Sequence, residues 1–381
     1  MNDQNKKLLI IILIVSILAL SGSCVKAVGV IGTITVGGAP SGIAFDSGFN
    51  ELFVTDIATN NVAVISLNNN TSVANITLQD IPSNIVYDYG ANELFVTNTH
   101  SGTITVISDK NNTILTTLSV GEGPMGEVYD PARGEVFVVN AYNGVVSVIS
   151  DNSNTVVASI NVEVSDFGGV AYDSAKNEVF VASGNSVSII SDIDNSVISN
   201  VSVGIGPAGL AYDPAKGEIF VDNFNSNSVS IISDTTNTVI ATVPVEYSPS
   251  GIVFDPNVND FFVTNTGSNS VSVISDSNNT VIGTLAVGQM PGGIVYNQGA
   301  GEIFVVNGND GTISLISDTS GTFTTPSPSV PEFSVSSWTL TTMAAMAGAF
   351  LIAITAKSHV LKPKKSVGRI SEQYREIKTP N

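Results

Sequence analysis

The chain repeats itself seven times, and this internal repetition restricts its fold more than any other feature. An aromatic residue followed by an acid or an amide recurs every 40 to 43 residues. The seven pairs are Phe45-Asp46, Tyr87-Asp88, Tyr129-Asp130, Tyr172-Asp173, Tyr212-Asp213, Phe254-Asp255 and Tyr296-Asn297. One structural unit is therefore built seven times.

Each repeat contains four short apolar runs separated by turn residues. In the fifth repeat they cover 209–212, 218–221, 228–233 and 238–245, with Gly, Asn, Asp and Pro between them. Short runs rich in Val and Ile predict an antiparallel meander, and four strands per repeat of this length are typical of a propeller blade. Helical solenoids need a 3.6-residue pattern, which is absent, and a parallel β-helix has much shorter coils. The sequence predicts an all-β, seven-bladed β-propeller of four-stranded antiparallel blades.

The seventh repeat lacks its outermost run, and a matching run lies near the start of the chain. Residues 30–37 (VIGTITVG) match residues 281–288 (VIGTLAVG), the outermost run of the sixth repeat. We therefore predict that 30–37 form the outer strand of the seventh blade, which closes the ring and covers an exposed sheet edge. The predicted propeller covers 28–318.

The N-terminus carries the pattern of a secretory signal. Lys6 and Lys7 precede the apolar run 8–20, and small residues follow, so 1–27 are predicted to be a signal peptide cleaved after Ala27. Two alternatives stay open: a lipid attached to Cys24, and an uncleaved anchor.

The C-terminal region carries the pattern of a membrane anchor. Residues 335–356 contain no charge, and at about 1.5 Å per residue they could cross a hydrocarbon core of about 30 Å. A Ser/Thr/Pro linker (319–334) precedes them and a basic tail (357–381) follows. Because positive flanks stay in the cytoplasm, we expect a single-pass protein of the cell membrane with an extracellular propeller and a cytoplasmic C-terminus. A buried helix of a soluble protein is the alternative, but it does not account for the flanking cations.

Two stretches resemble known families. The repeat, for instance GPAGLAYDP at 206–214 followed by EIFV at 218–221 and VSIISD at 229–234, resembles the YVTN-type β-propeller repeat over about 28–318. That family is common in archaeal surface-layer and cell-surface proteins, which implies the fold but no particular activity, since propellers host binding modules and enzymes alike. The segment Val330-Pro331-Glu332-Phe333, with the apolar and basic residues after it, resembles PEF-type C-terminal sorting signals and implies processing or attachment at the envelope.

Charge and residue types argue against several functions. The chain has 33 acidic and 14 basic residues, a net charge of −19, so it offers no basic field for nucleic acid. Its histidines are His100 and His359, which cannot build a multi-histidine metal site in the propeller. We therefore expect no metal. Phosphate-binding glycine loops are absent from the sequence, so we expect no cofactor, and a serine nucleophile elbow is absent as well. The turns that resemble 130–134 are interpreted as reverse turns, because one acidic pair per hairpin supplies too few calcium ligands.

A candidate ligand-binding rim is expected where the repeats differ from one another. In each blade the loop before the innermost strand (the leading loop) and the loop between the second and third strands (the companion loop) should open on one end, around the channel. The fourth leading loop, 166–168, lacks the Pro of the other six. Divergent residues in repeats two to four are predicted to line one sector: His100, Glu122, Met125, Tyr142, Asp166 and Phe167. The alternative is that they are solvated loop positions. The glycine that begins each inner strand is expected to let the strands crowd the axis.

Six Asn-X-Ser/Thr triplets are candidate glycosylation sites in an exported domain. They begin at Asn69, Asn70, Asn75, Asn111, Asn200 and Asn278. Chance occurrence in an Asn- and Thr-rich chain is the alternative.

These patterns together predict a non-enzymatic cell-surface protein for adhesion, envelope structure or ligand capture. The expected partners are envelope proteins or glycans. One alternative is an envelope hydrolase or lyase, lactonase-like, in which His100 and Glu122 act at the rim as catalytic residues. Another is a scaffold for a partner protein.

Overall fold

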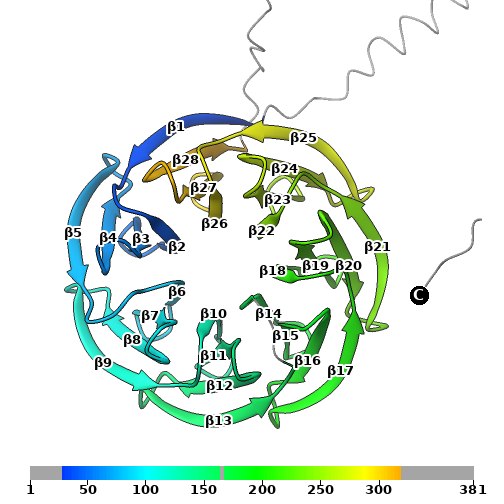
Figure 1. Ribbon diagram of the computed structural model, residues 1–381, viewed down its shortest axis with the longest axis horizontal. Coiled ribbons are helices and arrows are strands. Elements are labelled where there is room, and N and C mark those ends of the chain that lie inside the picture. The colour runs from blue at the N-terminus through cyan, green and yellow to red at the C-terminus, as the bar shows by residue number, and fades with distance from the viewer. Residues whose placement is uncertain (1–27, 164–166, 319–381) are drawn as a thin grey trace, which may run out of the picture. The chain divides into compact units, whose positions relative to one another are not determined.

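The computed structural model describes residues 28–163 and 167–318, which form seven four-stranded antiparallel sheets around a central axis (Figure 1). The regular secondary structure of these residues consists of β-strands alone. This confirms the predicted all-β, seven-bladed propeller. The predicted signal peptide (1–27), linker (319–334), membrane helix (335–356) and basic tail (357–381) lie outside the described residues. Within the described residues, no helix meets the length and hydropathy needed to cross a membrane.

Six blades are continuous in sequence, and each runs from the axis outwards. Blade 1 is β2 (Pro40–Asp46), β3 (Glu51–Asp56), β4 (Asn61–Ser66) and β5 (Thr71–Thr77); blade 2 is β6 (Ile85–Asp88), β7 (Glu93–Asn98), β8 (Thr103–Ser108) and β9 (Thr113–Ser119); blade 3 is β10 (Pro124–Asp130), β11 (Glu135–Asn140), β12 (Val145–Ser150) and β13 (Thr155–Asn161). Blade 4 is β14 (Val170–Asp173), β15 (Glu178–Ser183), β16 (Ser186–Ser191) and β17 (Ser196–Ser202); blade 5 is β18 (Pro207–Asp213), β19 (Glu218–Asn223), β20 (Ser228–Ser233) and β21 (Thr238–Pro244); blade 6 is β22 (Pro249–Asp255), β23 (Asp260–Asn265), β24 (Ser270–Ser275) and β25 (Thr280–Ala286).

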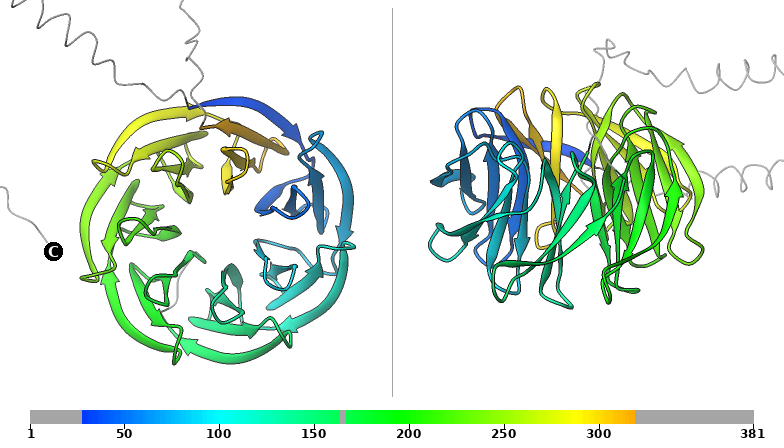
Figure 2. Two further views of the ribbon diagram at one scale, coloured as in Figure 1. Left: turned by 180° about the vertical axis from the view of Figure 1, so that it is seen from behind. Right: turned by 60° about the horizontal axis from the view of Figure 1, so that its bottom comes forward.

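The seventh blade joins the two ends of the propeller. It contains β26 (Pro291–Asn297), β27 (Glu302–Asn307), β28 (Thr312–Ser317) and, as its outermost strand, β1 (Gly29–Thr35). β1 pairs antiparallel with β28, so that Thr33 lies opposite Ser314 and Ile34 opposite Ile313. Figure 2 shows β1 as the blue outer arc against the orange β28. The predicted closure of the ring by the N-terminal strand is therefore confirmed.

Apolar side chains fill the spaces between adjacent blades. The third residue of each second strand is a fully buried phenylalanine: Phe53, Phe95, Phe137, Phe180, Phe220, Phe262 and Phe304. Phe53 of blade 1, for example, belongs to one cluster with Leu94 and Val96 of blade 2. Each blade thus completes the core of its neighbour, which is why a closed ring of repeats is stable where one repeat would not be.

The outermost strand of every blade contains a β-bulge occupied by an exposed aliphatic residue. The bulged residues are Ile31, Val73, Leu115, Val157, Ile198, Ile240 and Ile282. A bulge bends an edge strand and breaks its regular row of hydrogen-bonding groups, so it hinders pairing with a strand from another molecule.

The end of the ring away from the leading loops, called here the opposite end, is held by turns and polar links. The Asp130 carboxylate accepts the N–H of Ala132 at 2.8 Å and that of Arg133 at 3.4 Å, as expected for a reverse turn. Lys176 of blade 4 pairs with Asp234 of blade 5 at 3.4 Å, and the same link joins blades 5 and 6. The four described Lys and Arg residues, Lys110, Arg133, Lys176 and Lys216, all lie in loops at this end.

Candidate functional site

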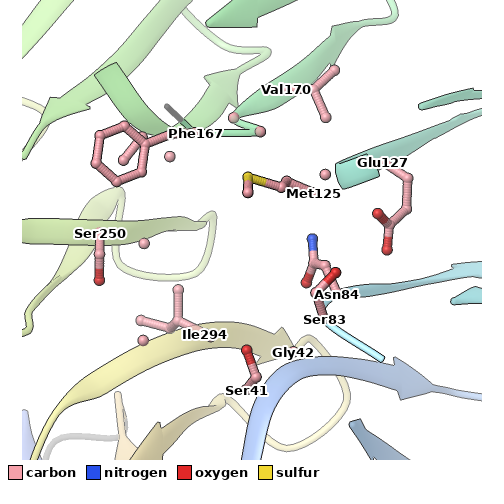
Figure 3. A pocket seen from close by; sticks show the side chains of 18 of the residues that line it. Ser41, Gly42, Ser83, Asn84, Met125, Glu127, Phe167, Val170, Ser250 and Ile294 are labelled. Carbon is pink, nitrogen blue, oxygen red and sulfur yellow. The ribbon is translucent and has the colours of Figure 1, made fainter. Parts of the chain in front are cut away.

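A channel of about 530 Å³ lies at the centre of the ring, lined mainly by residues at the beginning of the seven inner strands or directly before them (Figure 3). The leading and companion loops lie together at its mouth. The Ala141 N–H donates to the Gly123 carbonyl at 2.9 Å, and the Phe224 N–H donates to the Gly206 carbonyl at 2.8 Å. Both loop types therefore open on one end of the ring, as predicted, and this end is called the channel end.

A collar of glycines lets the inner strands approach one another at the channel. The collar positions are Gly42, Gly126, Gly169, Gly209, Gly251 and Gly293. A Cβ atom on Gly126 would overlap the Gly168 carbonyl oxygen, and one on Gly293 would overlap that of Ser41 in the adjoining blade. The predicted crowding of strands is thus confirmed. Blade 2 departs from the pattern, because Asn84 occupies its collar position.

The residue after the collar is aliphatic in six blades and Glu127 in blade 3. The six are Ile43, Ile85, Val170, Leu210, Ile252 and Ile294. Glu127 is only 7% exposed, and neither carboxylate oxygen has a partner at hydrogen-bonding distance among the described residues. Burial raises the pKa of Glu127 well above its usual value, and the nearby Thr97 hydroxyl opposes this only in part. Sequence reasoning missed Glu127, although an alignment of the seven repeats exposes a single acid at an otherwise aliphatic position.

A second acid, Asp222, is buried behind the channel wall in blade 5. Blades 1, 2 and 6 carry Thr55, Thr97 and Thr264 at this position of the second strand. The Thr55 hydroxyl accepts the Gly42 N–H at 2.7 Å and donates to the Ser83 carbonyl of the next blade at 2.9 Å. The Asp222 carboxylate faces the N–H groups of Ala208 and Gly209, but complete burial raises its pKa to about 7. Asp222 lies within β19, so it belongs to a strand and not to the companion loop that follows it.

The predicted rim residues fall into two groups. Met125 and Phe167 line the channel, and the Phe167 ring packs against Phe224 with 5.1 Å between ring centres. Glu122 and Tyr142 lie side by side on the exposed loops, where the Tyr142 N–H donates to the Glu122 carbonyl at 3.2 Å.

His100 is exposed in the companion loop of blade 2. There the Ser101 hydroxyl, with a further contribution from His100, lowers the pKa of Asp80. No hydrogen bond or ion pair among the described residues joins His100 to Glu122, and their catalytic pairing stays a prediction. Asp166 lies outside the described residues.

The channel end presents apolar side chains together with acids. Six large apolar residues of its loops are 41% to 66% exposed, and we call this set the apolar rim: Ile57, Ile81, Tyr142, Ile205, Tyr247 and Met290. Five acids lie in the same loops: Asp80, Glu122, Glu163, Glu246 and Asp310. The described Lys and Arg residues are all at the opposite end, so this end combines apolar surface with negative charge.

Met290 is held in a backbone conformation that is unfavourable for its residue type. Its φ is 52°, at the position where Gly123 (67°) and Gly206 (68°) lie in the leading loops of blades 3 and 5. The left-handed region costs a residue with a side chain about 1 kcal/mol. The fold therefore displays an exposed methionine at a position suited to glycine.

All six candidate glycosylation residues are exposed. Asn69, Asn70, Asn111 and Asn278 lie in loops at the opposite end, and Asn75 and Asn200 lie on the outermost strands. Glycans at these positions would leave the channel end uncovered. Their attachment stays a prediction.

Comparisons with known proteins identify the fold. No protein-family model matches the chain, and no curated protein matches its sequence. A chain in the crystal structure of a mitotic checkpoint complex is similar, with a TM-score of 0.68 and 12% identity over 76% of this chain and 91% of that chain. A chain of Kuenenia stuttgartiensis hydrazine synthase is also similar, with a TM-score of 0.64 and 17% identity over 78% and 98%. At these identities the similarity shows a shared propeller fold alone.

Among the described residues, no group of three or more His, Cys, Asp and Glu side chains is placed to hold a metal ion.

Proposed function

We propose that this protein is a non-enzymatic binding propeller of the cell surface whose channel end contacts an envelope protein. The observation that carries the proposal is the apolar rim, which brings exposed residues from the loops of six blades to one end of the ring. Exposed apolar side chains rimmed by polar groups mark protein-binding surfaces, and aromatic residues such as Tyr142 and Tyr247 are enriched at the energetic centres of such surfaces.

The charge at this end indicates the partner's chemistry. Five acids lie in the same loops as the apolar rim, and the described Lys and Arg residues all lie at the opposite end. Complementary potentials raise association rates and exclude partners of like charge. The partner is therefore an envelope protein with an apolar patch flanked by Lys or Arg.

The cell-surface location is supported by the sequence patterns at both ends of the chain. A signal-like segment at 1–27 and a membrane-anchor pattern at 335–356 would place the propeller outside the cell. The resemblance of the repeat to YVTN-type proteins and of 330–333 to a PEF-type signal favours the same location. The candidate glycosylation residues lie away from the channel end, which is consistent with a binding surface there.

Photo-crosslinking of the full-length protein in its own membranes tests the proposal. A photoreactive phenylalanine at position 142 or 247 should yield a crosslinked envelope protein, whereas the same residue in place of Phe49 or Tyr89, exposed at the opposite end, should not. The combined changes Ile205→Ser, Tyr247→Ser and Met290→Gly should weaken capture about thirtyfold or more, since a buried aromatic at the centre of an interface contributes about 2 kcal/mol or more. Equal crosslinking from both ends would contradict the proposal.

A further inference from the structure

We propose that the channel mouth binds one uncharged saccharide residue, held between the ring of Phe167 and the side-chain amide of Asn84. This site for a small ligand is separate from the proposed protein-binding surface. It rests on the proposed function in one respect, namely that ligands bind at the channel end.

Side chains from several blades converge on the cavity. Figure 3 shows Phe167 and Asn84 on opposite sides of it, with Met125 on the wall between them and Ser41 and Ser250 on the remaining side. The volume of about 530 Å³ lies within the range of about 300 to 1,000 Å³ that is usual for small-molecule sites. The site therefore has the size and the mixed lining of a small-molecule pocket that can hold a saccharide ring.

The lining presents no accessible charge. Glu127 is its one titratable residue, and both of its carboxylate oxygens are covered. A cationic ligand would find no exposed carboxylate within the channel, and an anionic ligand would find no Lys or Arg. An ion moved into such a site loses hydration without gaining a counter-charge, so the lining selects uncharged ligands.

Free hydrogen-bonding groups lie beside an apolar surface. The Ser83 hydroxyl is engaged with Thr97 at 2.9 Å, and the Ser250 hydroxyl with Thr266 at 2.5 Å. The Asn84 amide and the Ser41 hydroxyl, in contrast, make no hydrogen bond with the other described residues, so both can bond a ligand. A saccharide ring carries hydroxyls at its edge and C–H groups on its faces, which suit this amide and the Phe167 ring.

Asn84 and Phe167 are both departures from the repeat. The other six blades carry glycine where Asn84 stands and proline where Phe167 stands. Neither residue type belongs to the repeated blade pattern, and both residues line the channel. The repeat also supplies a variant that should fold, because Asn84→Gly restores the residue that six blades already use.

Titration calorimetry on the full-length protein tests the site. The neutral probes are maltose, cellobiose, mannobiose and diacetylchitobiose, and the charged probes are glucosamine and glucuronic acid. At least one neutral disaccharide should bind, and the charged sugars should bind at least tenfold more weakly. Asn84→Gly should weaken binding about tenfold, which corresponds to about 1.4 kcal/mol, and Phe167→Ala should do the same. Asn50→Gly at the opposite end is the matched control and should leave affinity unchanged.

Each result bears on the inference separately from the proposed function. Absence of binding by every neutral probe, stronger binding of a charged sugar, or full affinity in Asn84→Gly would overturn it. Enzymatic removal of glycans from envelope proteins distinguishes a protein-linked saccharide from a free one. Binding of the envelope proteins to the channel should be lost after this treatment only if the saccharide is attached to them. The photo-crosslinking at 142 and 247 does not depend on Asn84, so the protein-binding surface can stand while the saccharide site fails.

Discussion

An Asp222→Thr variant is expected to be more stable than the parent protein at pH 8 by several kcal/mol. Burial raises the pKa of Asp222 from 3.8 to about 7, and each unit of such a shift corresponds to about 1.4 kcal/mol of penalty on the ionised form in the fold. Threonine is the residue of blades 1, 2 and 6 at this position, and its hydroxyl there satisfies backbone groups of two blades. The substitution therefore removes a buried charge without opening a large cavity.

The direction of the pH dependence follows from the raised pKa. Between about 4 and 7 the folded protein binds more protons at Asp222 than the unfolded chain does, so stability falls as the pH rises through this range. The pKa values of Asp192 and Asp255 are also raised, to about 6, chiefly by burial, and that of Glu127 is raised in the same direction. The parent protein should be more stable at pH 5 than at pH 8, and the advantage of Asp222→Thr should shrink as the pH falls.

Urea unfolding at pH 5 and pH 8 measures both effects. The reciprocal variant Thr264→Asp places the same acid in blade 6 and should lose stability mainly at pH 8, since Thr264 is also fully buried. A parent protein whose stability is unchanged or higher at pH 8, or an Asp222→Thr variant with no gain there, would show that Asp222 is not held in the fold with a raised pKa.

An Ile34→Ala variant is expected to lose about 2 to 5 kcal/mol of unfolding free energy, the usual effect of truncating a buried aliphatic residue. Ile34 of β1 is 5% exposed and packs in one cluster with Phe304 and Ile313 of blade 7 and Leu52 of blade 1. The substitution weakens the packing of the N-terminal strand β1 against the last blade. Since this packing closes the ring, its loss should destabilise the whole propeller.

Ile31→Ala in the same strand is the matched control. Ile31 occupies the bulge and is 59% exposed, so its truncation should change stability by no more than about 0.5 kcal/mol. Urea midpoints compare the two variants, and amide hydrogen exchange should show the larger increase in β28 for Ile34→Ala. Equal losses in the two variants would mean that β1 does not contribute through its buried face.

The candidate site was predicted only in part from the sequence. Met125 and Phe167 were expected near the channel because they interrupt the repeat in the leading loops, and both line it. Asn84 and Glu127 were missed, although each also interrupts the repeat. Both lie where inner strands begin, whereas divergent residues were expected only in the leading and companion loops.

The fold and its closure followed from the sequence alone because the same local signals recur seven times. Strand-forming runs, turn residues and one displaced strand specify the blades and their order without knowledge of any distant contact. Only the tertiary structure decided which departures from the repeat meet around the axis, which carboxyl groups are buried away from water, and which side chains stay exposed at one end. Those properties depend on residues far apart in the chain that become neighbours only when the ring closes, so no single repeat contains them.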